Sequence, residues 1–145
     1  MKNKRIAMIA SEANPLIKVG GLADVIYSLS KELVKKKGEV GIFVPYYEQI
    51  RHKTQYNPTF VTSFSVAFLK GFEDVSVYEV DIDGIKYYLL ENRTYFMRRR
   101  VYEEADDNER FAFFSIASLH ALKKLNFIPD IIHVHDWQVG MIPAM

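Results

Sequence analysis

The stretch RIAMIASEANPLIKVGGLADVIYSLSKELVKKKGEVGIFV, residues 5–44, decides the fold class. It opens with a short apolar run at residues 5–10, which predicts a strand covered on both faces. After a loop, apolar residues recur at helical spacing from Leu22 to Val34, and three lysines and a glycine then end the helix. Residues 40–44 predict a second buried strand. Strand, helix and strand in this order make a right-handed βαβ unit, which builds a parallel sheet.

The middle of the chain predicts antiparallel strands. Residues 59–69 and 75–82 are rich in Val, Phe, Thr, Ser and Tyr, and Asp83-Gly84 separates the second run from residues 85–90. An Asp-Gly pair between two such runs is typical of a two-residue hairpin turn. We expect this hairpin region to be inserted in the parallel sheet or attached to its edge.

The last third of the chain predicts a loop, a second long helix and a further strand. Residues 95–105 lack a clean period and indicate the loop. Asp106 begins a variant of the capping box with Glu109, and apolar residues continue at helical spacing after it. Residues 131–134 predict another buried strand, and a helix begins in residues 137–145. The expected fold is α/β: a Rossmann-like, mostly parallel sheet with helices on both faces and an antiparallel hairpin region.

The composition restricts the partners and the compartment. The chain has 145 residues, of which 49% are hydrophobic, and this suits one domain with one core. Nineteen Lys and Arg residues against 18 Asp and Glu residues leave a net charge of +1, so no general attraction to nucleic acid or to a membrane surface is expected. The chain has no cysteine and no apolar run of about 18 residues, which favours a cytoplasmic protein. Because the sequence stops inside a predicted helix, we expect a piece of a longer polypeptide.

Ligands of such sheets bind beyond the carboxyl ends of the strands, and Lys18, Gly20 and Gly21 lie there, at the mouth of the first helix. The glycines let backbone N–H groups approach a ligand, the helix N-terminus favours an anion, and the lysine adds a full positive charge. This suits a phosphate or diphosphate. The alternative is a glycine-rich turn with a solvated lysine.

Carboxylates near the starts of both helices have two interpretations. Asp24 lies in the first turns of the first helix, and Asp107 and Asn108 lie at the mouth of the second. Each can complement the helix dipole or cap the helix. Each can also hydrogen-bond the hydroxyl groups of a polar substrate.

The last predicted strand carries His133 and His135 on one face, with His135 nearer the ligand crevice. Together with Asp136 they could begin a metal site. Ligand count argues against a metal, because only His52 and His120 remain, His120 lies within the second helix, and no Glu or Asp follows at a spacing that would complete a set. A structural interpretation also fits, with His133 buried and Asp136 capping the next helix, and it leaves His135 free to face a ligand.

Three consecutive arginines, Arg98 to Arg100, lie in the predicted loop beside aromatic residues. They could contact nucleic acid, face a small anion or lie in solvent. The balanced charge of the chain and the single basic loop give little support to nucleic acid and favour the solvated interpretation.

Several blocks of the sequence recur, in the same order, in one known family. They are Ser11-Glu12-Ala13 with Pro15, residues 18–25 with the signature Lys-x-Gly-Gly-Leu, Pro45-Tyr46-Tyr47, Tyr95-Phe96 with Arg98, residues 107–114 and residues 130–137. In these blocks the chain resembles bacterial glycogen synthases and plant starch synthases. The resemblance covers essentially the whole chain.

The resemblance implies a GT-B type glycosyltransferase, in which two Rossmann-like domains face a cleft. The family transfers glucose, with retention of configuration, from ADP-glucose (UDP-glucose in some members) to the non-reducing end of an α-1,4-glucan. The resemblance implies no cofactor and no metal. Residues 1–145 match the first part of the N-terminal domain. The C-terminal nucleotide-binding domain is absent, so we expect the chain to be inactive alone and to need the remainder of its own polypeptide as a partner.

The resemblance also assigns roles to residues. It implies that Lys18 reaches the phosphates of the donor. It also implies that Gly20 and Gly21 let the loop approach these phosphates. It makes His135 the histidine beside the transferred glucose. The remaining assignments are a cleft carboxylate near the sugar, Asp107, and residues near the donor or acceptor, Asp24 and Tyr95.

Two functions of other classes stay open. The first is a non-catalytic carbohydrate-binding or regulatory module on the same fold. The second is a metallohydrolase built on His133, His135 and Asp136.

Overall fold

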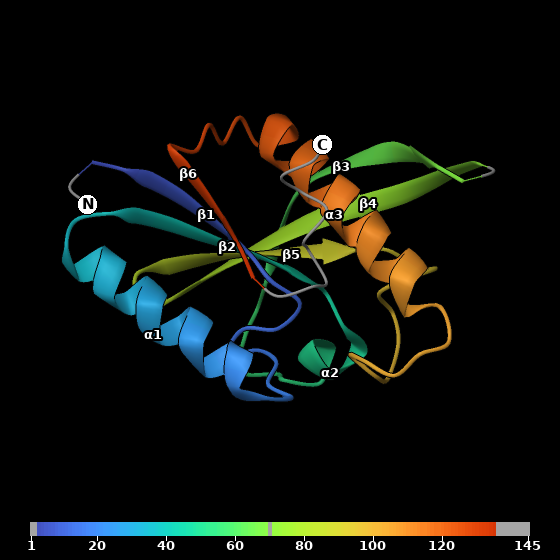
Figure 1. Cartoon of the computed structure of the whole chain (residues 1–145), viewed down its shortest axis with the longest axis horizontal. Coiled ribbons are helices and arrows are strands. Elements are labelled where there is room, and N and C mark those ends of the chain that lie inside the picture. Colours follow the sequence, from blue (N-terminus) through green and yellow to red (C-terminus); the bar gives the residue numbers. More distant parts are fainter. Residues whose placement is uncertain (1–2, 70, 136–145) are drawn as a thin grey trace.

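The computed structural model describes residues 3–69 and 71–135, which form one mixed sheet with helices packed on it (Figure 1). The strand order is β3-β4-β5-β2-β1-β6. Four neighbouring strands are parallel: β5 (Ile85–Glu91), β2 (Glu39–Pro45), β1 (Arg5–Ile9) and β6 (Ile131–Val134). The strands β3 (Thr59–Phe68) and β4 (Gly71–Ile82) extend the β5 side of the sheet in antiparallel pairing.

The two long helices cover opposite faces of the sheet. Alternate residues of β1 separate the two core layers: Ile6 and Met8 pack with Ile26 of α1 (Gly21–Lys35), whereas Ala7 and Ile9 pack with the aromatic side chains of α3 (Asp107–Lys124). A one-turn helix, α2 (Glu48–Arg51), follows β2. The expected α/β architecture with helices on both faces is confirmed.

The predicted hairpin turn is also confirmed. Asp83 and Gly84 have φ angles of 53° and 79° and join β4 to β5 between the paired residues Ile82 and Ile85. Positive φ at both central positions is the geometry that Asp-Gly favours, and its twist matches that of the strands. The β3–β4 hairpin extends beyond the parallel part of the sheet (Figure 1).

Two local predictions are wrong. Residues 131–134 form a strand, but Ile131 and Ile132 are 41% and 42% exposed, because β6 is the edge strand of the described sheet and pairs with β1 on one side. Asp106 is the N-cap of α3, yet its carboxylate does not cap the helix, since it pairs with Arg98 instead. The helix predicted for residues 137–145 lies outside the described residues.

None of the described helices combines the length and the apolarity that a membrane crossing requires.

Candidate functional site at the carboxyl edge of the sheet

Loops that follow three parallel strands touch one another at the carboxyl edge of the sheet. Ser11 follows β1, and its hydroxyl lies 2.5 Å from the hydroxyl of Tyr102, in the loop after β5. Tyr47, which follows β2, donates its hydroxyl to the carbonyl oxygen of Ser11 at 2.7 Å. Since α1 and α3 each begin after such a loop, both helix N-termini also lie at this edge. This is the position at which open α/β sheets bind ligands.

A buried carboxylate organises the loop between β1 and α1. Glu12 is 2% exposed. Its side chain accepts hydrogen bonds from the backbone N–H of Val19 at 2.7 Å and of Gly20 at 3.2 Å. These N–H groups lie at the start of α1, where the helix dipole also favours a negative charge. Glu12 therefore fixes the turn that carries Lys18.

Lys18 and Asp24 lie together on the outer side of this turn. The ammonium Nζ of Lys18 is 2.5 Å from Oδ2 of Asp24, and both side chains are about half exposed, at 51% and 47%. The amide Nδ2 of Asn14 donates to Oδ1 of the same carboxylate at 3.2 Å. An ion pair this exposed contributes little to stability, about 0–1 kcal/mol, so Lys18 can exchange Asp24 for another anion at small cost.

The two glycines of the turn are not required by the fold of the described residues. Gly20 has φ −138°, which any residue adopts, and a Cβ built there would lie 3.7 Å from Oε1 of Glu12, an ordinary contact. A Cβ on Gly21 would have no described atom within 4 Å. The open space at both positions is available to a ligand that approaches the backbone.

His135 follows β6 and faces the α1 side of the sheet. Its backbone N–H donates to the carbonyl oxygen of Ile9 at 3.2 Å, and its ring Nε2 is 3.3 Å from Sδ of Met8. The rings of His133 and His135 have centroids 4.0 Å apart, so the prediction that both histidines lie on one face is confirmed. Burial, together with the nearby His133, lowers the pKa of His135 to about 4. The imidazole is therefore neutral at pH 7.

The described residues include only part of the predicted metal site, namely His133 and His135. Asp136 lies outside the described residues. Among residues 3–69 and 71–135, His, Cys, Asp and Glu side chains do not gather in groups of three that could hold a metal ion.

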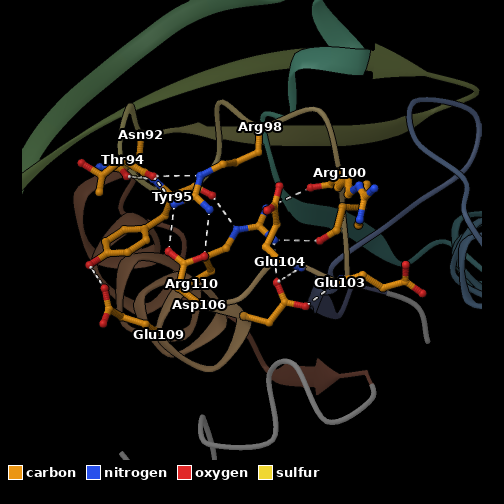
Figure 2. A network of polar contacts seen from close by, with 12 residues as sticks. Asn92, Thr94, Tyr95, Arg98, Arg100, Glu103, Glu104, Asp106, Glu109 and Arg110 are labelled. Carbon is orange, nitrogen blue, oxygen red and sulfur yellow. Dashed lines mark hydrogen bonds and ion pairs between the residues drawn. The ribbon is translucent and has the colours of Figure 1, made fainter.

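A buried arginine organises the loop between β5 and α3 (Figure 2). The side chain of Arg110 is fully buried. It donates to the carbonyl oxygens of Tyr95 at 2.8 Å, Val101 at 3.0 Å and Arg100 at 3.2 Å. It also donates to Oδ1 of Asp107 at 2.8 Å. The planar guanidinium therefore holds three points of the loop and one carboxylate at once.

Asp107 has a second set of contacts with the same loop. Its oxygens accept from the backbone N–H of Glu103 at 2.9 Å and of Glu104 at 3.2 Å, and its side chain is 17% exposed. Arg98 fastens the loop at another point, with a bidentate pair to Asp106 at 2.8 and 2.9 Å. Arg98 is therefore held by Asp106, whereas Arg99 and Arg100 are exposed, as the solvated interpretation predicts.

Tyr95 lies apart from the other predicted site residues. It is 5% exposed and packs against Phe113 and Phe68 on the α3 face of the sheet. Its hydroxyl donates to Oε2 of Glu109 at 2.6 Å, and burial and this bond raise its pKa. The structure thus brings Lys18, Gly20, Gly21 and Asp24 together around the start of α1. His135 directly follows β6, the strand that pairs with β1. Asp107 lies in the Arg110 network, and Tyr95 lies in the core.

Reasoning from sequence missed two organising residues, Glu12 and Arg110. The sequence does indicate the burial of Arg110, because its spacing places it on the same face of the helix as Phe114, Ala117 and Ala121, all of which are buried. A charge on the apolar face of a helix predicts a buried, hydrogen-bonded group. Glu12 carried a weaker signal, a charge directly after a buried strand.

Comparison with known proteins identifies the class of protein. A family model described as the starch synthase catalytic domain matches residues 5–145, and the chain belongs to this family. The chain is 42% identical over 143 residues to a glycogen synthase of Streptococcus mutans serotype c, and 40% identical to one of Streptococcus uberis. Both alignments cover 97% of this chain and 30% of the relative, so the chain spans about a third of the length of these relatives.

A solved structure is similar over nearly the whole chain. It is the catalytic domain of starch synthase IV from Arabidopsis thaliana bound to ADP and acarbose. The TM-score is 0.89 at 31% sequence identity, over 96% of this chain and 29% of that one. The chain therefore matches a short part of a GT-B type starch synthase catalytic domain, as expected from its sequence.

Proposed function

We propose that the polypeptide containing this chain transfers glucose, with retention, from ADP-glucose to the non-reducing end of an α-1,4-glucan. The observation that carries the proposal is that Lys18 and His135 follow the carboxyl ends of adjacent parallel strands and both lie on the α1 side. The similar starch synthase was solved with ADP and acarbose, a nucleotide and an oligosaccharide-like ligand, which supports this pair of substrates.

The proposed division of roles follows from the contacts. Lys18 exchanges Asp24 for the diphosphate of the donor, which approaches the backbone over Gly20 and Gly21 at the start of α1. Asp24, once released, accepts a hydrogen bond from a sugar hydroxyl. As the bond between the anomeric carbon and the diphosphate breaks, negative charge grows on the leaving group, and the lysine and the helix N-terminus stabilise it there.

The sugar side of the site needs neutral and anionic groups. Neutral His135 hydrogen-bonds a hydroxyl of the transferred glucose without adding positive charge beside an oxocarbenium-like carbon. The carboxylate of Asp107 lies near the same sugar and stabilises the positive charge, whereas Tyr95 supports the donor or acceptor side of the cleft from the core. The nucleotide sugar is a substrate, and the proposal includes no cofactor or metal.

We also propose that residues 1–145 form the first part of an N-terminal Rossmann-like domain, and that a C-terminal domain supplies the rest of the nucleotide site. The short coverage of the relatives supports this. The chain alone is then inactive, and its partners are the substrates and the rest of its polypeptide. The lack of cysteine favours the cytoplasm as its location.

The test is glucosyl transfer to glycogen by the full-length polypeptide and its Lys18→Ala variant. Lys35→Ala is the matched control, because it removes the same charge from the other end of α1. We expect kcat/KM for ADP-glucose to fall at least about 10-fold for Lys18→Ala and to stay within about twofold for Lys35→Ala. Equal kcat/KM in all three proteins would refute the role of Lys18. Strong binding of maltooligosaccharides by the chain alone, without transfer by the full-length polypeptide, would favour the binding module.

A further inference from the structure

We propose that Arg110 is a positioning residue of the glucosyl site, which acts by holding the carboxylate of Asp107 in place; this rests on the function proposed above. Arg110 itself cannot touch a substrate, since its side chain has no exposed surface. Its hydrogen bonds run to three backbone carbonyls of the loop after β5 and to Asp107.

The contacts of Asp107 explain why its position depends on Arg110. Oδ1 of the carboxylate lies between Nη1 of Arg110 and the N–H of Glu104, and Oδ2 accepts from the N–H of Glu103. The backbone at these N–H groups belongs to the loop that Arg110 also holds, at Arg100 and Val101. One guanidinium therefore binds the carboxylate directly and also holds the loop whose N–H groups bind it.

The position of this unit connects it to the edge at which the ligand is expected. The loop held by Arg110 includes Tyr102, whose hydroxyl contacts the hydroxyl of Ser11. Glu12, which follows Ser11 in the chain, fixes the turn that carries Lys18. A displacement of the loop would move the Asp107 carboxylate relative to the donor. Misplacement of a catalytic group by about 1 Å can lower a rate about 100-fold.

A lysine at this position cannot reproduce the arrangement. An ammonium group is a compact charge and cannot direct donors along the plane of a fork toward four acceptors. The variant Arg110→Lys therefore keeps the charge but releases part of the loop. We expect kcat of the full-length polypeptide to fall about 10- to 100-fold, with KM for ADP-glucose within about twofold, because Glu12 still holds the turn that carries Lys18.

The matched control is Arg98→Lys. Arg98 fastens the same loop through a bidentate pair with Asp106 but does not contact Asp107. We expect its kcat to stay within about threefold of the wild type, although its melting temperature falls. An equal loss of kcat in Arg98→Lys and Arg110→Lys would mean that loop stability alone matters, and would overturn the proposal.

A double-mutant cycle separates positioning from general destabilisation. If Arg110 acts through Asp107, the double variant Asp107→Asn with Arg110→Lys has the same kcat as Asp107→Asn, measured per folded molecule. If the double variant instead loses kcat by the product of the two single-variant losses, the proposal is overturned. If Arg110→Lys does not accumulate as folded protein, Asp107→Glu tests the same point, because it keeps the charge but moves the carboxylate by one methylene. Wild-type kcat in Asp107→Glu would overturn the proposal.

Different results would overturn the proposed function and the role of Arg110. A wild-type full-length polypeptide without glucosyl transfer would overturn the proposed function, and this inference with it. A wild type that transfers glucose, with an Arg110→Lys variant of unchanged kcat, would overturn the inference alone.

Discussion

The imidazole of His135 shows how one residue acquires its chemistry from its neighbours. The side chain lies beside Met8 in the core and next to the ring of His133, and the two surroundings together disfavour a positive charge. An exposed histidine would be partly protonated at pH 6.5. A neutral ring at the pH of the cell suits a group that hydrogen-bonds a sugar while positive charge develops nearby.

We predict that the imidazole of His135 titrates near pH 4 in the folded protein. The folded-state pKa lies below the unfolded value of about 6.5, so the unfolded chain binds more protons between these values. The stability contribution of the neutral ring is therefore present above pH 6.5 and is lost as the pH falls toward 4. Imidazole nitrogen shifts in NMR titrations measure the pKa directly.

His133→Asn is the control for the second cause of this shift. It removes the charge beside His135, so the pKa of His135 should rise toward its ordinary value while burial still keeps it low. A His135 pKa near 6.5 in the wild type would contradict the neutral ring at physiological pH.

At the scale of elements, the turn between β1 and α1 separates the requirements of folding from those of binding. Glu12 supplies the contacts that hold the turn, whereas Gly20 and Gly21 supply space that the described chain does not use. Glycine at the first position of a helix lowers stability relative to alanine, through the entropy of the unfolded chain. Gly21, the first residue of α1, is thus a cost to the fold that a ligand can explain, whereas glycine is favoured over alanine at the N-cap, where Gly20 lies.

We predict that Gly21→Ala leaves stability unchanged or raises it by up to about 1 kcal/mol, since no strain and no contact oppose the methyl group. The same change should raise KM for ADP-glucose in the full-length polypeptide at least about 10-fold, by blocking approach to the backbone. Urea unfolding and initial rates measure the two effects. Gly71→Ala, also in open space but in the β3–β4 hairpin, should leave KM unchanged. A destabilised Gly21→Ala protein with normal KM would contradict this division.

Local patterns predicted most elements correctly, because their causes lie within a few residues. The apolar runs of β1 and β2, the spacing in α1 and the Asp-Gly turn each determine structure without help from distant residues. The errors arose where tertiary contacts decide. Asp106 would cap α3 if Arg98 did not bind its carboxylate, and the burial of β6 depends on what packs beside the strand.

The candidate site was predictable in part for the same reason. The Lys18 turn follows from its glycines and from the strand before it, and His135 from alternation along β6. The contact of Lys18 with Asp24 could have been anticipated from their spacing around one turn, but the network around Arg110 could not. It joins residues up to 15 positions apart through backbone carbonyls, which carry no sequence signal.

At the scale of the whole molecule, apolar surface gathers at the β6 end. Ile128 is 73% exposed, and Ile131 and Ile132 are each more than 40% exposed. Ile128 also lines a cavity of about 800 Å³ against α3, whose walls are mainly apolar and include Ile116, Leu119 and Phe127. Exposed apolar side chains along an open sheet edge and an apolar cavity are surfaces that commonly pack against protein. The rest of the catalytic domain is the occupant that fits our proposal.

We predict that the isolated 145-residue chain self-associates, whereas the full-length polypeptide does not use this surface to do so. Sedimentation velocity over a range of concentrations should show an average mass that rises with concentration for the chain. Ile128→Glu with Ile132→Glu should reduce this association. A monomer at all concentrations, with a high melting temperature, would count against a missing cover.

The most direct measurement is a crystal structure of the full-length polypeptide with ADP-glucose and a maltooligosaccharide. We predict that the ammonium of Lys18 leaves Asp24 for the diphosphate, that the diphosphate lies against the backbone at Gly20 and Gly21, and that the ring of His135 faces the glucose. A donor bound elsewhere, with Lys18 still paired to Asp24 and His135 without a sugar contact, would contradict the account.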